Sequence, residues 1–306
     1  MPKIPKLLHY VFACDPRFPN QKPWSLVHHV CVRSAVERIR PDAVLFHCDR
    51  EPEGPWWELT RPLVTTVPVE APATIFGNPL LHPAHQSDVL RLEALLREGG
   101  IYLDIDVLVH RDFDDLLDGH STIMGREEGV GAANAAMLAE PGAPFLRRWY
   151  EEYRWFRGQG RDAYWSEHSV EVPWRLAQAH PDEITLLDER AFFWPLWTDD
   201  HLKLLFEPQP ESFDARSTYA NHLWESRAWG RYLEHLTPGR VRAVDSPFHR
   251  WCRPFVADLP DRYGAPTLSA RWERVKRIGR PRIEKALGAA GGFAAGLLDR
   301  RSARGG

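Results

Sequence analysis

The sequence is poor in the features that mark several special classes of protein. Its 306 residues include 4 cysteines, and the net charge is -3 with 26% charged residues. Such a balance indicates neither a disordered polyelectrolyte nor a nucleic-acid-binding protein, so we expect no nucleic-acid partner. Because the cysteines show no C-x-x-C spacing and a chain of this length needs no disulfide framework, we interpret them as buried thiols in a reducing compartment: Cys14, Cys31, Cys48 and Cys252.

Long apolar runs are also absent. The N-terminus lacks the apolar run and small-residue cleavage site of a signal peptide, and no stretch approaches the roughly 18 apolar residues of a membrane span. We therefore expect a cytoplasmic protein. Hydrophobic residues make up 43% of the chain, which is enough for a large core in one or two domains.

Charge is distributed unevenly along the chain. Residues 265–306 contain ten Lys or Arg against three Asp or Glu. We predict one domain over residues 1–264 and a basic, partly helical tail over residues 265–306. Basic amphipathic segments bind anionic membrane surfaces, so the tail is either a solvated segment or a peripheral contact with the inner face of a membrane.

Strand-like and helix-like segments alternate from the N-terminus. Leu7 to Phe12 is a short apolar run typical of a buried strand, and residues 24–39 indicate a helix that Arg40-Pro41 ends. Further segments extend the pattern: strands at 43–46, 63–69, 184–187 and 203–206, a helix at 145–156 and an aromatic loop at 190–197. This alternation predicts an α/β fold with a mostly parallel central sheet flanked by helices.

The most informative stretch is a helix followed directly by a strand. Residues 85–98 place apolar side chains on one helical stripe and end at Gly99-Gly100. Residues 101–109 then alternate as one strand, with Asp104 and Asp106 on the same face. Both carboxylates are therefore expected to point the same way.

Two aligned carboxylates suit a divalent cation. On a strand their Cβ atoms lie roughly 6.5–7 Å apart, and oxygen ligands favour Mg²⁺ or Mn²⁺. The alternative is a basic partner such as Arg91 or Arg126. Asp88 and Arg91 are spaced i, i+3 on the preceding helix, so they either reach the same ligand or form a surface salt bridge.

Four segments, in order, resemble a known family. Residues 4–12, Ser87-Asp-Val-Leu-Arg91, residues 99–106 and Tyr219-Ala-Asn-His-Leu-Trp224 are similar to the DXD-motif sugar-binding glycosyltransferases of glycosyltransferase family 32. That family includes yeast initiating mannosyltransferases and bacterial capsular-polysaccharide transferases. The resemblance implies a GT-A type nucleotide-diphospho-sugar transferase fold and an enzyme of bacterial polysaccharide biosynthesis.

The resemblance further implies a reaction and its partners. The enzyme would be a metal-dependent, retaining glycosyltransferase that moves a hexose from a nucleotide-sugar donor, with UDP expected over GDP. The acceptor would be a hydroxyl of a glycan, a lipid-linked molecule or a small molecule. A negative charge develops on the diphosphate leaving group, and a divalent cation with an Arg or His would stabilise it.

Site residues carry over by their positions in the motifs. Asp104 and Asp106 would hold Mn²⁺ or Mg²⁺ on the donor diphosphate, with Asp106 as the direct ligand, while Asp88 and Arg91 would face the ribose and sugar hydroxyls. The remaining assignments are Tyr10, Val11 and Phe12 beside the nucleobase, Asn134 near the donor sugar, His222 on the metal or pyrophosphate, and Trp224 behind His222. His222 as a core histidine and Asn134 as a polar turn residue remain alternatives.

Two other functions fit parts of the pattern. An apolar strand ending in D-x-D is also typical of haloacid-dehalogenase-like phosphatases, but there Gly-Thr usually follows, whereas Val-Leu-Val follows Asp106. A non-catalytic carbohydrate-binding protein could keep the same fold without turnover. The metal pair together with Asp88 and Arg91 favours the transferase.

Overall fold

The computed structural model describes residues 3–12, 23–209 and 218–265. The chain divides into two compact units, residues 1–264 and residues 265–306. The basic tail with its predicted membrane contact, and also Cys14, lie outside the described residues. The other cysteines, Cys31, Cys48 and Cys252, are free and buried as expected. Within the described ranges, no helix has both the length and the apolar character that crossing a membrane requires.

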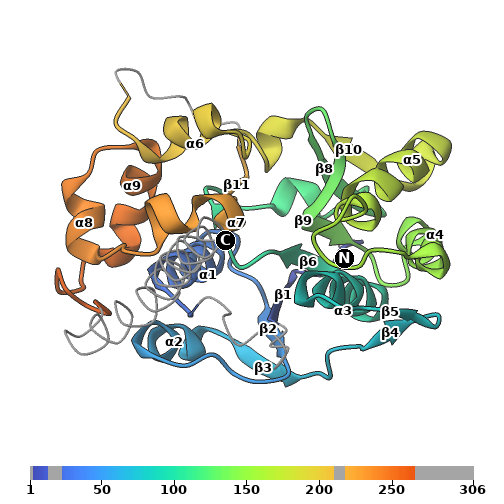
Figure 1. Ribbon diagram of the computed structural model, residues 1–306, viewed down its shortest axis with the longest axis horizontal. Coiled ribbons are helices and arrows are strands. Elements are labelled where there is room, and N and C mark those ends of the chain that lie inside the picture. The colour runs from blue at the N-terminus through green and yellow to red at the C-terminus, as the bar shows by residue number, and fades with distance from the viewer. Residues whose placement is uncertain (1–2, 13–22, 210–217, 266–306) are drawn as a thin grey trace, which may run out of the picture. The chain divides into compact units, whose positions relative to one another are not determined.

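The first unit is built on a seven-stranded sheet with the order β10-β8-β9-β6-β1-β2-β3 (Figure 1). The strands are β1 (Leu7–Phe12), β2 (Ala43–Cys48), β3 (Thr65–Pro68), β6 (Gly100–Leu103), β8 (Thr122–Glu127), β9 (Gly131–Ala139) and β10 (Thr185–Leu187). β9 runs antiparallel to both of its neighbours, and the other pairs are parallel. The predicted α/β class with a mostly parallel sheet is confirmed.

Two small antiparallel sheets accompany the large one. β7 (Val107–Val109) pairs with β11 (Ala220–His222), and β4 (Thr74–Ile75) pairs with β5 (Asn78–Pro79). The β7–β11 pair joins chain segments more than a hundred residues apart. It therefore brings the C-terminal part of the unit to the residues that follow β6.

Helices cover both faces of the large sheet. The α-helices are α1 (Leu26–Ile39), α2 (Pro55–Thr60), α3 (Pro83–Glu98), α4 (Pro144–Glu152), α5 (Val172–Ala179), α6 (Asp199–Phe206), α7 (Glu225–Ala228), α8 (Pro238–Ala243) and α9 (Pro247–Cys252). Short 3₁₀-helices span Arg61–Leu63, Asp114–Leu116, Tyr153–Trp155, Pro181–Glu183, Glu189–Ala191 and Arg253–Val256, and π-helices span Glu167–Glu171 and Trp229–Leu233.

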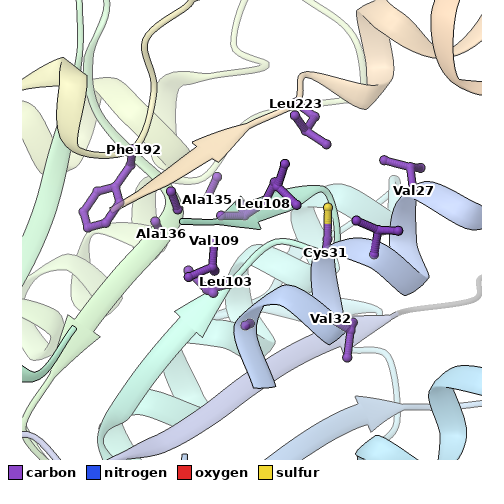
Figure 2. Close-up of a cluster of buried hydrophobic side chains, with 14 of the residues drawn as sticks. Val27, Cys31, Val32, Leu103, Leu108, Val109, Ala135, Ala136, Phe192 and Leu223 are labelled. Atoms are coloured by element: carbon purple, nitrogen blue, oxygen red, sulfur yellow. The ribbon is translucent and has the colours of Figure 1, made fainter. Parts of the chain in front are cut away.

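Two hydrophobic clusters hold these layers together. One packs α3, α4 and α5 against the sheet, and the other packs α1 and the C-terminal helices against its opposite face. Strand alternation assigns the side chains: Ile101 and Leu103 join the α1 cluster, whereas Tyr102 joins the α3 cluster. Figure 2 shows Cys31 of α1 near Leu108 of β7 and Leu223, so the small sheet rests on buried apolar contacts.

The turn from α3 into β6 depends on two glycines. Gly99 and Gly100 have φ of 66° and 112°, which glycine adopts without steric cost. A Cβ on Gly100 would lie 2.6 Å from the Leu7 carbonyl oxygen of β1. The Gly-Gly pair therefore lets β6 enter the sheet directly beside β1.

The expectation of one continuous strand over residues 101–109 is wrong. β6 ends at Leu103 and β7 begins at Val107, and the Val107 N–H donates to the Asp104 carbonyl at 3.0 Å across the intervening turn. The Asp106 carbonyl accepts from the Leu223 N–H at 3.0 Å, so the chain leaves the large sheet and pairs with β11 instead. The alternation of apolar residues could not predict this break, because it depends on a hydrogen bond with Leu223, which lies far along the chain.

The expected strand at residues 203–206 is also wrong, because these residues form the end of α6. The Thr198 hydroxyl accepts from the His201 N–H at 3.4 Å, and Asp199 and Asp200 occupy the first turn. Leu202, Leu205 and Phe206 are buried at helical spacing. The segment 203–206 is about one helical turn long, which is too short to distinguish helical from strand periodicity.

Candidate functional site

Asp104 and Asp106 lie in the turn between β6 and β7. Together with His222 they form a group in which one potential ligand atom from each residue lies within 4.8 Å of the others. The carboxylates are neighbours because of this turn, and not because they share a strand face. Among the described residues this is the arrangement best suited to holding a divalent cation.

The pairing of β11 with β7 brings His222 to the aspartates. His222 lies opposite Val107 in that ladder, directly beside Asp106. Its Nε2 is 3.3 Å from Asp106 Oδ1, and the Glu225 N–H donates to Asp106 Oδ2 at 2.8 Å. The segment from residue 222 to residue 225 therefore surrounds one carboxylate with donors.

Trp224 takes an unusual backbone conformation within that segment. Its φ is 53° and its ψ is 47°, in the left-handed region that bulky side chains rarely adopt. The indole N–H donates to the Pro195 carbonyl at 2.8 Å, and the ring centroid lies 4.2 Å from that of His222. Trp224 thus packs against His222, as the motif implied, and turns the chain so that Glu225 reaches Asp106.

Arg91 organises the other side of the site. Its Nη1 lies 3.0 Å from Asp104 Oδ1, and its Nη2 lies 3.3 Å from Asp88 Oδ1. Nη1 also donates to the Asn134 carbonyl at 3.0 Å, and the Asn134 amide donates to Asp88 Oδ1 at 2.7 Å. The pair of Asp88 and Arg91 is buried, so the surface salt-bridge alternative is wrong. Asn134 lies in strand β9, so its turn alternative is wrong as well.

The two aspartates experience opposite electrostatic environments. Burial raises the pKa of Asp104 despite the nearby Arg91 cation. Burial alone would also raise the pKa of Asp106, but His222 and the Glu225 N–H hold it below its usual range. Burial alone would lower the pKa of His222, yet the Asp106 carboxylate holds it above its usual value. Asp106 therefore carries the more firmly ionised carboxylate.

These residues line a cavity of about 830 Å³. Most of the positions expected for the site lie on its wall: Val11, Phe12, Asp88, Arg91, Asp104, Asp106, Asn134, His222 and Trp224. Tyr10 does not, because its side chain is fully buried in the α1 cluster with Cys31. The end of β1 therefore presents Val11 and Phe12 to the cavity, while Tyr10 packs inward.

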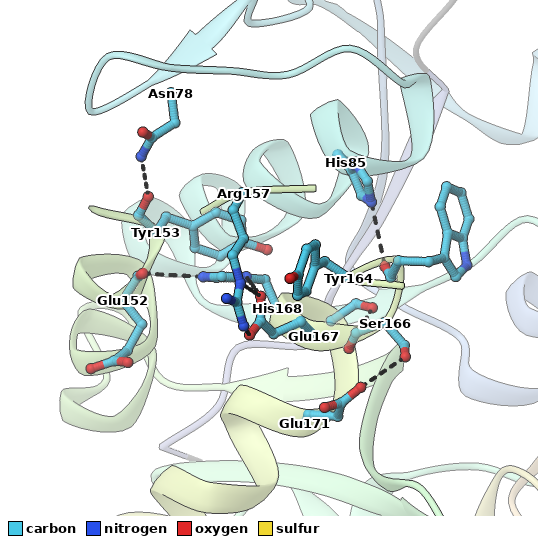
Figure 3. Close-up of polar contacts among 12 residues, drawn as sticks. Asn78, His85, Glu152, Tyr153, Arg157, Tyr164, Ser166, Glu167, His168 and Glu171 are labelled. Atoms are coloured by element: carbon cyan, nitrogen blue, oxygen red, sulfur yellow. Dashed lines mark hydrogen bonds and ion pairs between the residues drawn. The ribbon is translucent and has the colours of Figure 1, made fainter. Parts of the chain in front are cut away.

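A wall that sequence reasoning missed comes from residues 161–170. Trp165, Ser166 and Ser169 line the cavity from this segment. Figure 3 shows how it is held: His85 of α3 contacts the Trp165 carbonyl at 3.3 Å, and Arg157 pairs with Glu167. No periodic pattern marks the segment, because its residues lie in a loop and a π-helix.

Several charged and aromatic side chains of the cavity also escaped the sequence analysis. They are His28, Glu127, Glu225 and Arg227, and Trp197 of the expected aromatic loop at residues 190–197 joins them on the wall. His28 Nε2 and Glu225 Oε1 lie 3.0 Å apart, which joins α1 to α7. Glu127 and Glu128 are adjacent in sequence and cannot be told apart from the sequence alone. Glu127 is the last residue of β8 and is buried, whereas Glu128 follows the strand and is exposed.

Comparison with known proteins identifies the family. A sequence model described as a glycosyltransferase sugar-binding region containing the DXD motif matches residues 70–123, which include α3 and both aspartates. A protein named Glucan organizing enzyme 1 from Cryptococcus neoformans var. grubii is 39% identical over 270 residues, covering 84% of this chain and 72% of that protein. This chain belongs to the DXD-motif glycosyltransferases.

As a DXD-motif glycosyltransferase, the chain is an enzyme that transfers a glycosyl group from a nucleotide sugar. The phosphatase and the non-catalytic alternatives are therefore not supported. The fold class is the GT-A type expected for such a transferase, with its mostly parallel sheet flanked by helices. Assignment to glycosyltransferase family 32, a bacterial origin and a cytoplasmic location stay predictions.

Solved structures similar to this DXD-motif glycosyltransferase are also glycosyltransferases. Mouse xyloside xylosyltransferase 1 is 15% identical, with a TM-score of 0.44 and coverage of 72% of this chain and 98% of that one. The galactosyltransferase LgtC is 14% identical, with a TM-score of 0.41 and coverage of 87% and 99%. GlyE from Streptococcus pneumoniae TIGR4 is 9% identical, with a TM-score of 0.46 and coverage of 84% and 61%. The family assignment does not depend on these structures.

Proposed function

We propose that this protein is a metal-dependent, retaining hexosyltransferase that uses a UDP-sugar in preference to a GDP-sugar. The acceptor is a hydroxyl of a glycan, a lipid-linked molecule or a small molecule. One observation carries the proposal: Asp104, Asp106 and His222 converge on the wall of a cavity of about 830 Å³. That volume lies in the range of pockets that enclose a ligand of the size of a nucleotide sugar.

The donor set suits Mn²⁺ or Mg²⁺. Carboxylate oxygens are the preferred ligands of these ions, and imidazole is acceptable to Mn²⁺. His222 turns Nε2 toward Asp106 Oδ1 at 3.3 Å, and one potential ligand atom from each of Asp104, Asp106 and His222 lies within 4.8 Å of the others, so a single cation can reach all three side chains. The residues present therefore fit a divalent cation, which supplies positive charge to the departing diphosphate.

Asp106 is the better direct ligand of the two aspartates. Asp104 Oδ1 already accepts from the Tyr102 hydroxyl at 2.6 Å and pairs with Arg91 at 3.0 Å. Asp106 is held by the neutral Glu225 N–H and by His222, which is itself a potential ligand. In this proposal Arg91 and Asp88 fix the shape of the donor side, and Asp106 with His222 holds the cation.

The preference for UDP and the retention of configuration rest on the family resemblance. Retention means that the anomeric configuration of the product equals that of the donor. NMR of the anomeric proton in the first product formed distinguishes retention from inversion directly. A product of inverted configuration would contradict this part of the proposal and leave the transferase activity intact.

Calorimetric titration of UDP and GDP, each with and without Mn²⁺, tests the donor site. We expect Mn²⁺-dependent binding of UDP by the wild-type protein and its loss in Asp106→Asn. The exposed Asp182→Asn is the matched control, since it removes the same charge outside the cavity. Absence of binding of either nucleotide by folded wild-type protein would contradict the proposed function.

A further inference from the structure

Glu127 differs from every other carboxylate on the wall of the cavity. Its side chain is buried, with a relative exposure of 8%, and it accepts one hydrogen bond, at 2.9 Å, from the indole N–H of Trp197. Within the described ranges it has no basic partner at ion-pair distance. The other carboxylates of the wall are each paired: Asp88 and Asp104 with Arg91, Asp106 with His222, and Glu225 with His28.

An ionised carboxylate has room for about four hydrogen bonds, so most of the acceptor capacity of Glu127 is unused. Burying such a group with a single neutral donor is unfavourable unless a ligand supplies further donors. Burial does raise the pKa of Glu127, although His222 and the Trp197 N–H oppose that effect. Glu127 lines the same cavity as His222 of the predicted metal site.

Trp197 places an exposed aromatic ring beside this carboxylate. Its indole N–H is fixed by Glu127, while 37% of the residue remains exposed. Arg227 lies over the ring with its Cζ 5.2 Å from the ring centroid. Among the described residues Arg227 has no acidic partner at ion-pair distance. An apolar ring and an unpaired acid therefore stand side by side in the cavity, with a cation next to them.

This combination matches the chemistry of a pyranose ring. A hexose presents hydroxyl donors at its edge and C–H groups on its faces, and aromatic rings pack on such C–H surfaces. We infer that Glu127 and Trp197 bind the hexosyl group of the donor, with Glu127 accepting hydrogen bonds from its hydroxyls and thereby selecting the sugar. The inference rests on the proposed function, because it places the sugar beside a metal-bound diphosphate.

Glu127 can select the donor sugar because it is unfavourable to leave a buried carboxylate without hydrogen-bond partners. A site built to pair with a hydroxyl rejects an analogue that lacks this hydroxyl, because the buried carboxylate then stays unsatisfied. An epimer moves one hydroxyl away from the same oxygen and has a similar effect. Glu127 is therefore a residue that determines donor-sugar specificity, whereas the nucleotide is bound elsewhere in the cavity.

The test separates binding of the sugar from binding of the nucleotide. UDP, UDP-glucose, UDP-galactose, GDP and GDP-mannose are titrated in the presence of Mn²⁺ into wild type, Glu127→Gln and Glu128→Gln. Glutamine keeps an oxygen that accepts from Trp197, so the fold is expected to persist. Glu128 is exposed and does not line the cavity, so Glu128→Gln is the matched control.

We expect Glu127→Gln to bind the bare nucleotide within twofold of wild type and to bind the preferred nucleotide sugar at least tenfold more weakly. Glu128→Gln should equal wild type for both ligands. Trp197→Phe keeps an aromatic ring but loses the N–H donor. It should therefore bind the preferred nucleotide sugar about threefold more weakly and alter the ratio of affinities for UDP-glucose and UDP-galactose.

Three outcomes would overturn the inference. Glu127→Gln could bind the preferred nucleotide sugar as tightly as wild type, or it could lose the bare nucleotide and the nucleotide sugar to the same extent. In both cases the wild-type protein binds nucleotide and the proposed function stands. If folded wild-type protein binds no nucleotide with Mn²⁺, the proposed function itself fails and the inference fails with it.

Discussion

Asp104 and Asp106 are two residues apart, yet their surroundings have little in common. Asp104 directly follows β6 and pairs with Arg91, a cation buried in the packing of α3 against the large sheet. Asp106 precedes β7 and contacts His222 and the Glu225 N–H, which come from the C-terminal part of the unit. One carboxylate is therefore held by residues packed on the large sheet, and the other by residues in and directly after the small sheet.

The different surroundings of Asp104 and Asp106 suggest that the two aspartates of the D-x-D motif have different tasks. The Asp104 side is a closed network in which Arg91, Asp88 and Asn134 satisfy one another. The Asp106 side has fewer bonds, and His222, one of the two groups that contact Asp106, is itself a potential ligand. We infer that the first side maintains the shape of the cavity and that the second binds the cation, and each prediction below tests this division.

The largest effect is expected for Asp106→Asn. Asparagine keeps an acceptor for the Glu225 N–H but loses the negative charge, so transfer should fall at least about 1,000-fold while the free energy of unfolding falls by about 1–3 kcal/mol, the usual contribution of hydrogen bonds to a charged group. Release of nucleoside diphosphate measures the first quantity and urea unfolding the second. Asp104→Asn should lose only about 10- to 100-fold; equal losses in the two variants would contradict the division.

Arg91→Met should act mainly on stability. It leaves Asp88 and Asp104 buried without their cation, and removing one partner of a buried ion pair costs about 3–5 kcal/mol. Urea unfolding at pH 7 gives the value. Arg97→Met, on the exposed side of the same helix, is the control and should change the free energy of unfolding by about 0.5 kcal/mol or less. A similar small loss for Arg91→Met would show that its network does not maintain the fold.

His222→Gln should weaken the response to metal without unfolding the protein. Loss of one ligand or orienting group typically lowers metal affinity about 10- to 100-fold, so the Mn²⁺ concentration for half-maximal activity should rise by that factor. His235→Gln removes an exposed histidine that does not line the cavity and should leave the Mn²⁺ dependence unchanged. Unchanged Mn²⁺ dependence in His222→Gln would exclude His222 from the metal site.

The smallest effect concerns a histidine without a carboxylate partner. Burial, and to a lesser degree Arg33, lowers the pKa of His29 to about 4, in contrast to the raised pKa of His222. The unfolded chain protonates His29 near pH 6.5, so between pH 6.5 and pH 4 the unfolded state binds more protons and stability falls on acidification.

Between pH 7 and pH 5, His29 should therefore reduce the free energy of unfolding by roughly 2 kcal/mol. Urea unfolding of wild type and His29→Asn at both pH values isolates this amount, because asparagine still pairs with the Thr60 hydroxyl and does not titrate. An identical decline in the two proteins would show that His29 does not contribute to acid sensitivity.

Local sequence patterns predicted much of the architecture. The apolar run of β1, the periodic stripe of α3 and the glycines that end α3 are local signals, and each element lies where its pattern placed it. The break between β6 and β7 could not be seen in this way, because it depends on backbone contacts with Leu223 and Glu225 far along the chain.

The candidate site was predictable to the extent that its residues lie in motifs. Asp88, Arg91, Asn134, Asp104, Asp106, His222 and Trp224 all line the cavity. Glu127 could not be found, since it has no distinctive spacing and its contact with Trp197, in the expected aromatic loop, joins residues 70 positions apart. Tyr10 points into the core because it lies on the same face of β1 as Leu8, whereas Val11 lies on the opposite face. The motif alone did not show which face of the strand each residue occupies.

The pairing of β11 with β7 determines how much of the chain must be synthesised before the site can form. Both aspartates emerge from the ribosome more than a hundred residues before His222 and Glu225. Until those later residues have been synthesised and paired with β7, Asp106 lacks both the imidazole and the N–H that hold it. A nascent chain that already contains the complete D-x-D motif therefore still lacks the proposed metal site, and we expect activity to begin only after the second strand of the small sheet has been added.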